Sequence, residues 1–213
     1  MLLLALDLSR AVVVTPPAPT PLENKTAQVL VEEVKSRTRL EWEIAAQAKP
    51  GVPAVVLKRG TGPAEGYTLR ASGASVEISG NDARGLLFGA GRLLRELRME
   101  RDRAWLPGEL NITTAPKVKL RGHQLGYRPK TNSYDGWTAA MWDQYIRELA
   151  VFGTNAIELI PPRSDDAADS PHFPAPQMPM MVEMSHIADS YGLDVWIWYP
   201  AMDKDYTDAA TLS

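Results

Sequence analysis

The sequence predicts a small α+β domain followed by an α/β domain that holds the first three βα units of an incomplete TIM barrel. Before residue 100, strand, hairpin and helix patterns follow one another without a regular repeat. Beyond residue 117, strand patterns centred near residues 121, 157 and 196 alternate with helix patterns. That alternation is typical of parallel strands joined by right-handed crossovers. A complete barrel needs about 250 residues, so three strands predict part of one, with a small open sheet as the alternative.

Composition changes at the same point in the chain. Residues 1–110 carry 15 basic and 13 acidic side chains, whereas residues 111–213 carry 8 and 13. The second segment also holds 12 of the 16 aromatic residues. We therefore expect a small domain over 11–100, a polar linker over 101–116 and the partial barrel over 117–213.

Overall charge and cysteine content exclude several classes of function. The 213 residues have a net charge of −3 and no cysteine. A general nucleic-acid binder would show a basic surplus, and disulfides, thiolate metal sites and cysteine nucleophiles need cysteine. The apolar run Met1–Leu6 is shorter than the roughly 20 residues of a membrane span, and no basic residue precedes it as in a signal peptide. We expect neither nucleic acid nor membrane as a partner.

The first segment contains a well-marked helix start. The β-branched run at 11–15 predicts a strand that ends at a proline-rich loop. Thr20 is placed to cap a helix, Pro21 suits the first helical position, and Glu23 completes a capping box. Apolar residues then recur at helical spacing, so this helix is expected to end near Arg39.

A hairpin and a second helix complete the small domain. A strand is expected over 53–58, and alternating apolar residues over 67–71 and 76–78 surround a glycine turn, which predicts paired strands. Asn81-Asp82 then caps a helix pattern that contains three glycines, Gly85, Gly89 and Gly91. Because glycine weakens a helix, we expect these glycines to allow the helix to pack closely against a sheet.

The second segment alternates strand and helix patterns. Strands are expected over 118–125, 155–160 and 193–199. One helix pattern begins at a Thr138 cap, has Phe152 on its apolar face and ends at Gly153. The second carries a methionine-rich stripe from Met180 and ends at Gly192; such a stripe is more typical of core packing than of a cofactor site.

Functional residues are expected where parallel strands end, because the carboxyl ends of such strands meet at one edge. Aromatic rings there would stack on sugar rings, and charged groups would hydrogen-bond sugar hydroxyls. A pair of Arg121 with Glu158 inside the barrel is the structural alternative. The expected substrate-binding residues are Arg121, His123, Glu158, Arg163, Trp198, Tyr199 and Asp203.

The remaining chemistry is sparse. The three histidines lack zinc-ligand spacing, so no metal and no cofactor is expected. Glycoside hydrolysis requires two carboxylates on either side of the scissile bond. Glu158 and Asp203 are a conceivable couple, but each is equally well explained structurally, so the catalytic residues stay unassigned.

Three short motifs resemble a known family. They are Glu-Gly-Tyr-Thr-Leu at 65–69, Val-Glu-Ile-Ser-Gly-Asn-Asp at 76–82 and Arg-Gly-Leu-Leu-Phe-Gly at 84–89. Together they resemble the small N-terminal domain of the glycoside hydrolases that include β-N-acetylhexosaminidases and α-glucuronidases. Arg121-Gly122 is similar to the start of the hexosaminidase barrel, which implies that Arg121 contacts the substrate sugar. Gly153-Thr154-Asn155 is similar to the entry into the second strand in both families.

The resemblance implies an N-terminal fragment of a secreted or periplasmic glycoside hydrolase that acts on poly- or oligosaccharides. His-Gln-Leu-Gly-Tyr over 123–127 departs from the hexosaminidase pattern, so the sugar is left open, as is the oligomeric state. In hexosaminidases the catalytic Asp-Glu pair follows the fourth strand, so this chain is expected to lack it and to be inactive alone. The alternative is a non-catalytic carbohydrate-binding or structural module.

Overall fold

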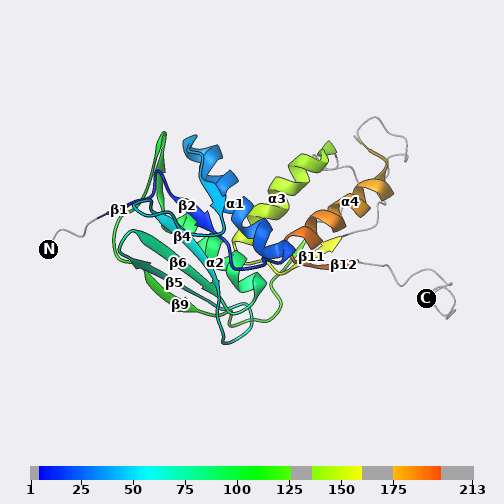
Figure 1. Cartoon of the computed structure of the whole chain (residues 1–213). Coiled ribbons are helices and arrows are strands. Elements are labelled where there is room, and N and C mark those ends of the chain that lie inside the picture. The colour runs from blue at the N-terminus through cyan, green and yellow to red at the C-terminus, as the bar shows by residue number, and fades with distance from the viewer. Residues whose placement is uncertain (1–4, 126–135, 160–174, 198–213) are drawn as a thin grey trace, which may run out of the picture.

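The computed structural model describes residues 5–125, 136–159 and 175–197 (Figure 1). The strands are β1 (Leu6–Asp7), β2 (Val12–Val14), β3 (Glu43–Ala45), β4 (Ala54–Arg59), β5 (Tyr67–Ser72), β6 (Ser75–Gly80), β7 (Arg98–Glu100), β8 (Arg103–Leu106), β9 (Asn111–Thr114), β10 (Gly122–Gln124), β11 (Ala156–Leu159) and β12 (Asp194–Ile197). The helices are α1 (Pro21–Thr38), α2 (Ala83–Glu96), α3 (Ala139–Val151) and α4 (Gln177–Ser190).

A six-stranded mixed sheet forms the centre of the first half, in the order β3-β2-β4-β6-β5-β9. β2 runs parallel to both β3 and β4, and β4 runs parallel to β6. β5 and β6 form the expected hairpin, with Gly73 at φ 58° in its turn. Helices α1 and α2 cover one face of this sheet (Figure 1). The α+β architecture expected of the first half is confirmed.

Helix α1 begins as its sequence predicts. The Thr20 hydroxyl accepts a hydrogen bond from the Glu23 backbone N–H at 3.3 Å, and the Thr20 backbone N–H donates to the Glu23 carboxylate at 2.7 Å. This is the complete capping box, which satisfies two N–H groups that lack a partner within the helix. Arg39 ends the helix in the left-handed conformation, with φ 70°.

The glycines of α2 allow close packing. A Cβ atom on Gly89 would lie 2.6 Å from the Ile78 side chain of β6, and one on Gly91 would lie 2.1 Å from the backbone oxygen of Val151 in α3. Only a residue without a side chain permits these approaches. The expected packing of α2 on a sheet is confirmed, and the same helix also packs against α3.

Residues 101–116 contain strands β8 and β9, although their sequence predicts a linker. β8 pairs antiparallel with β1 and β7, and β9 pairs antiparallel with the edge strand β5. Strands of two to four residues are too short for a visible alternation, and an open sheet edge pairs through backbone groups whatever the side chains. The polar composition of this segment therefore did not reveal them.

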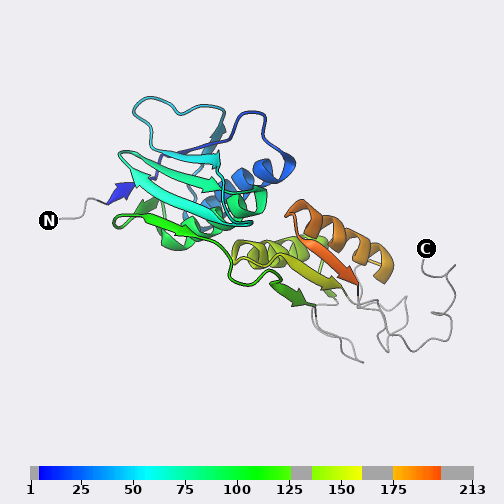
Figure 2. The ribbon, with the colours of Figure 1, turned by 90° about the horizontal axis from the view of Figure 1, so that it is seen from below.

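The second half contains a three-stranded parallel sheet in the order β10-β11-β12. Helices α3 and α4 cover one of its faces (Figure 2). The expected strand–helix–strand–helix–strand order is confirmed. β10 begins only at Gly122. Val118 and Leu120 were expected in this strand, but they lie in the segment before it and their side chains are exposed.

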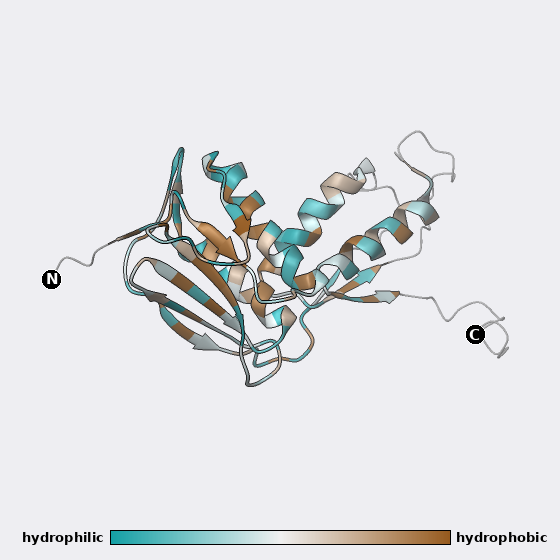
Figure 3. Cartoon of the chain, viewed as in Figure 1, coloured by the Kyte–Doolittle hydropathy of each residue, from teal (hydrophilic) through white to brown (hydrophobic). Residues whose placement is uncertain are grey.

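One apolar core connects the two halves. It runs from Val55 in β4 through Leu87 in α2 to Ile146 in α3 and Ile157 in β11. Figure 3 shows apolar positions on the strands and on the inward sides of the helices. Phe152, which was expected on the buried face of α3, is 71% exposed. It ends the helix as the C-cap residue, and the Arg95 guanidinium stacks on its ring at 4.7 Å.

Polar groups also join α1 to α3 and α4. The Arg147 side chain of α3 donates to the Tyr191 hydroxyl at 2.9 Å and forms an ion pair with Glu32 of α1. Burial raises the pKa of Tyr191 above its ordinary value, so the phenol stays protonated and donates to Asp143 at 3.1 Å. Within the described residues, no helix combines the length and apolar character needed to span a bilayer.

Candidate functional site

The carboxyl ends of the parallel strands bring three side chains into one row. Gln124 of β10 lies in register with Glu158 of β11, which lies in register with Trp196 of β12. Residues in register on neighbouring strands point to the same face of a sheet. We call these three residues the carboxyl-edge row.

The carboxyl-edge row faces away from the helices. The adjacent register, His123–Ile157–Val195, points the opposite way, because the His123 ring bonds the Tyr145 hydroxyl of α3 and Ile157 is fully buried. Glu158 is half-buried, and the Trp196 indole is 57% exposed. A carboxylate, an amide and an aromatic ring therefore lie together on the face of the sheet that α3 and α4 do not cover.

His123 belongs to the helix side of the sheet. Its Nε2 lies 2.8 Å from the Tyr145 hydroxyl, and the two rings meet edge to face at 5.7 Å. Tyr145 in turn packs against Trp137 and Trp142. The structure thus separates His123 from Glu158, although both lie near the carboxyl ends of their strands.

Arg121 lies at the opposite edge of the sheet, immediately before β10. Its Nη2 is 2.6 Å from the Glu65 carboxylate, and its Nε donates to the backbone oxygen of Gly153 at 2.7 Å. Its Nη1 donates to the backbone oxygen of Val118 at 2.8 Å. The pair of Arg121 with Glu158 weighed from the sequence is absent, because Glu65 of the first half takes the guanidinium instead.

Glu65 is the centre of a polar cluster at this amino edge. Its carboxylate also accepts from Asn155 at 3.1 Å and from Arg84 at 3.3 Å. Burial raises the pKa of Glu65, but the hydrogen bonds from Arg121, Asn155 and Arg84 outweigh it, so the pKa lies below its ordinary value. The carboxylate is therefore ionised at neutral pH and bound to two cationic groups.

Sequence reasoning did not single out Trp196, Glu65 or Arg84 as site residues. Trp196 could have been found, because the period-two spacing of the expected strand over 193–199 predicts the same face for Trp196 as for Trp198. Glu65 and Arg84 lie within the motifs 65–69 and 84–89, but sequence alone does not place a loop of one half against strands of the other. Of the expected binding residues, Arg163, Trp198, Tyr199 and Asp203 lie outside the described residues.

Chemically, the carboxyl-edge row suits an uncharged, hydroxyl-rich ligand. The indole offers a face for stacking, and the carboxylate and amide can accept and donate hydrogen bonds. In the part of the chain that the structure describes, no three His, Asp or Glu side chains gather as they would around a metal ion.

Comparison with known proteins gives one family match. The family described as glycosyl hydrolase family 20, domain 2, matches residues 4–116. A search of curated protein sequences finds no match.

Several solved structures share the fold over most of the chain. The family 20 β-N-acetylhexosaminidase of Streptomyces coelicolor A3(2) aligns with a TM-score of 0.69 at 19% identity, over 91% of this chain and 42% of that one. A mutant Streptomyces plicatus β-hexosaminidase in complex with its product GlcNAc aligns at 0.68 and 19%, over 91% and 42%. A Vibrio harveyi exo-β-N-acetylglucosaminidase in complex with N-acetylglucosamine aligns at 0.65 and 14%, over 91% and 33%. The chain thus spans less than half of each of these relatives.

Proposed function

Because the chain belongs to glycosyl hydrolase family 20, whose domain 2 it carries, we propose that it is part of a glycoside hydrolase that acts on glycans containing N-acetylhexosamine. Two of the solved structures with the same fold hold N-acetylglucosamine. The sugar-binding chemistry of the carboxyl-edge row supports the same substrate class. The proposal names hexosaminidases and not α-glucuronidases, because the matching family is glycosyl hydrolase family 20.

We propose that residues 117–213 supply the first three βα units of a (β/α)₈ barrel, next to a small domain that includes the expected 11–100 and extends through β9. The support is the parallel order β10-β11-β12 with helices on one face, which is the arrangement of successive units around such a barrel. In that arrangement the face that carries the carboxyl-edge row points into the barrel. The catalytic carboxylates are expected elsewhere in a longer protein, beyond these three units.

The observation that carries the proposed substrate contact is the register of Gln124, Glu158 and Trp196. Trp196 is placed to stack on an apolar sugar face, and Glu158 to accept a hydrogen bond from a hydroxyl or from the acetamido N–H. Arg163, Trp198, Tyr199 and Asp203 follow β11 or β12 in the sequence, and their contact with the sugar remains a prediction.

Calorimetric titration of the 213-residue chain with N,N′-diacetylchitobiose tests this contact. We expect measurable heat and about tenfold weaker binding in Glu158→Gln, since a hydrogen bond to a charged group contributes about 1.5–3 kcal/mol. Trp196→Ala should also weaken binding, because it removes the aromatic face on which the sugar would stack. The matched controls are Glu148→Gln and Met141→Ala, which change exposed side chains of α3. Both variants should bind like the parent. Absence of heat, or equal losses in the controls, would contradict the proposal.

A second candidate, carbohydrate binding without turnover, is favoured by the same exposed Trp196. The same chain should not hydrolyse an aryl N-acetyl-β-glucosaminide, because the catalytic pair is proposed to lie elsewhere. Hydrolysis by residues 1–213 would instead place the pair inside this chain. A longer gene product that binds the disaccharide but never hydrolyses it would favour the binding module.

A further inference from the structure

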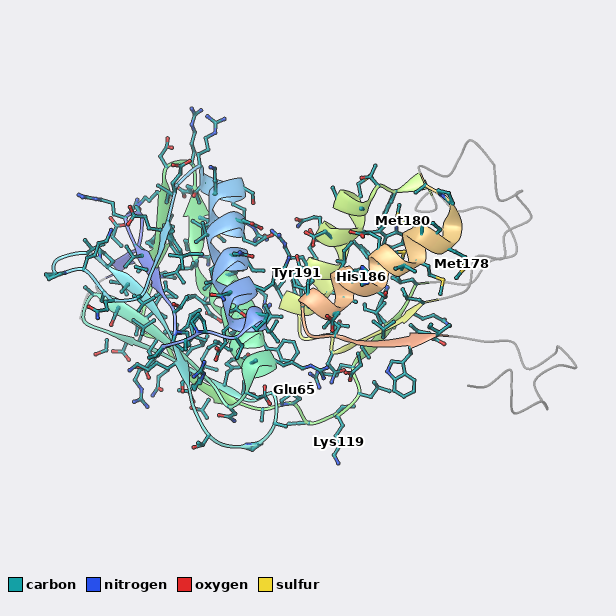
Figure 4. All side chains as sticks on the ribbon, turned by 45° about the vertical axis from the view of Figure 1, so that its right-hand side comes forward. Glu65, Lys119, Met178, Met180, His186 and Tyr191 are labelled. Carbon is teal, nitrogen blue, oxygen red and sulfur yellow. The ribbon has the colours of Figure 1, made fainter. Side chains whose placement is uncertain are left out.

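We propose that Glu65 and Arg84 of the first half form a clamp that holds the amino ends of all three parallel strands in register. We call it the amino-edge clamp; it consists of Glu65, Arg84, Arg121, Asn155 and Asp194. Figure 4 shows Glu65 at the junction of the mixed sheet and the parallel sheet. The proposal does not depend on the proposed function, since it concerns how the sheet is held together.

The first contact of the clamp holds β10. Arg121 immediately precedes this strand, and its Nη2 binds Glu65 at 2.6 Å while Nε and Nη1 donate to backbone oxygens. Its guanidinium also lies 5.3 Å from the centre of the Phe88 ring in α2. The charge of the Arg121 guanidinium is thus paired with Glu65, and its flat face packs against Phe88; both partners belong to the first half.

The second contact holds β11. Asn155 immediately precedes this strand and is only 4% exposed. Its Nδ2 donates to Glu65 at 3.1 Å, and its Oδ1 accepts from the Arg121 backbone N–H at 2.8 Å. A buried amide with fixed partners ties β11 to both β10 and Glu65.

The third contact holds β12. Arg84 at the start of α2 forms two hydrogen bonds with Asp194, the first residue of the strand, from Nη2 at 2.5 Å and from Nη1 at 3.3 Å. Nη1 also reaches Glu65 at 3.3 Å. This bidentate geometry fixes the orientation of the two side chains as well as the distance between them. Glu65 therefore contacts the residues that precede β10 and β11, Arg84 contacts the first residue of β12, and Arg84 and Glu65 are bound to each other.

Local structure also holds Glu65 in place. Its backbone has φ 59°, and its N–H donates to the Asp82 carboxylate at 2.7 Å. Asp82 also caps α2 by accepting from Gly85 at 2.7 Å. The same carboxylate thus orients Glu65 and begins the helix that carries Arg84.

The clamp gives Arg121 a different role from the one that the resemblance implied. It is a docking residue at the amino edge, whereas the carboxyl-edge row lies at the other end of the strands. Gln124 is three residues further along, about 10 Å at the rise of an extended strand. The clamp sets the register that brings Gln124, Glu158 and Trp196 into one row.

Amide hydrogen exchange of the 213-residue chain tests this inference strand by strand. Arg121→Met should speed exchange at least tenfold in β10, Arg84→Met should do so in β12, and Glu65→Gln should do so in all three parallel strands. Exchange in β4–β6 should stay within twofold of the parent. Glu77→Gln, which removes an exposed carboxylate of β6, is the control and should leave β10–β12 unchanged.

Arg84→Lys keeps the positive charge but loses the bidentate contact with Asp194. It is a milder variant that keeps the test informative if Arg84→Met unfolds the chain. It should speed exchange in β12 and leave β4–β6 as in the parent. Equal acceleration in β4–β6 and β12, or no acceleration in β12, would overturn the clamp. Neither result involves a sugar, so failure here is distinct from failure of the proposed function.

Discussion

The mixed sheet and the parallel sheet differ in how completely their apolar side chains are buried. The mixed sheet has six strands, with two helices packed on one face and a complete capping box on α1. The parallel sheet has three short strands, and its described residues include exposed Trp196 and Ile197. A small parallel sheet buries little by itself, so it depends on neighbours. The first half holds most of the buried apolar residues, and the described part of the second half presents polar and aromatic groups at the carboxyl ends of its strands.

The largest effect should come from separating the two regions at Gly91. We expect Gly91→Ala to lower the free energy of unfolding by about 3 kcal/mol, because the new Cβ would meet the backbone of Val151 rather than a flexible side chain. Urea denaturation measures it. Gly108→Ala is the matched control, since nothing lies within 4 Å of its Cβ position, and it should change little. A neutral Gly91→Ala would mean that α2 and α3 are not tightly docked.

Acid should weaken the junction next. The pKa of Glu65 lies below its ordinary value in the folded chain, so its contribution is present above the unfolded pKa and is lost as pH falls through the folded pKa. Thermal unfolding from pH 7 down to pH 3 should show a steeper loss of stability for the parent than for Glu65→Gln. Parallel curves for the two proteins would show that Glu65 has no share in the acid sensitivity.

Helix caps should show a smaller difference between the regions. Thr20→Ala should cost about 1 kcal/mol, because the capping box supplies two hydrogen bonds. Thr138→Ala in α3 should cost about 0.5 kcal/mol, because its hydroxyl accepts a single bond, of 3.4 Å. Urea midpoints of the two variants test the order, and a larger loss for Thr138→Ala would reverse the comparison.

The smallest effect should come from an exposed ion pair on the mixed sheet. Lys58 and Glu77 pair across β4 and β6 with side chains 53% and 42% exposed. Such pairs contribute about 0–1 kcal/mol, so Glu77→Gln should lower stability by less than about 0.5 kcal/mol. Urea denaturation in low and high salt measures it, and a loss above about 1 kcal/mol would show that the pair contributes more than an exposed ion pair does.

Local patterns predicted the regular elements well. The capping box of α1, the hairpin around Gly73 and the alternation beyond residue 117 depend on neighbouring residues, and each is present. The short strands within 101–116 were missed, because they form by pairing with sheet edges that are distant in sequence. The end of α3 next to Gly153 was predicted correctly, but Phe152 was wrongly expected to be buried, because a C-cap residue lies outside the helical spacing that defines the apolar face.

The candidate site was predicted only in part, and the reason is again long-range. Glu158 followed from its position near the end of a strand. The face on which a side chain points depends on strand register, which separated His123 from Glu158 and joined Gln124 to Trp196. Arg121 lies before the observed strand, which starts at Gly122, and its expected contact with a sugar stays a prediction.

By itself, the sequence determined the order of the helices and of the longer strands, the α+β character of the first half and the family resemblance, because hydrophobic periodicity, caps and short motifs are local properties. Only the tertiary structure decided the partners of charged groups. Glu65 and Arg121 are 56 residues apart in the chain and 2.6 Å apart in space. A carboxylate and a guanidinium attract any opposite charge, so the choice between Glu65 and Glu158 for Arg121 was made by the packing of the two halves.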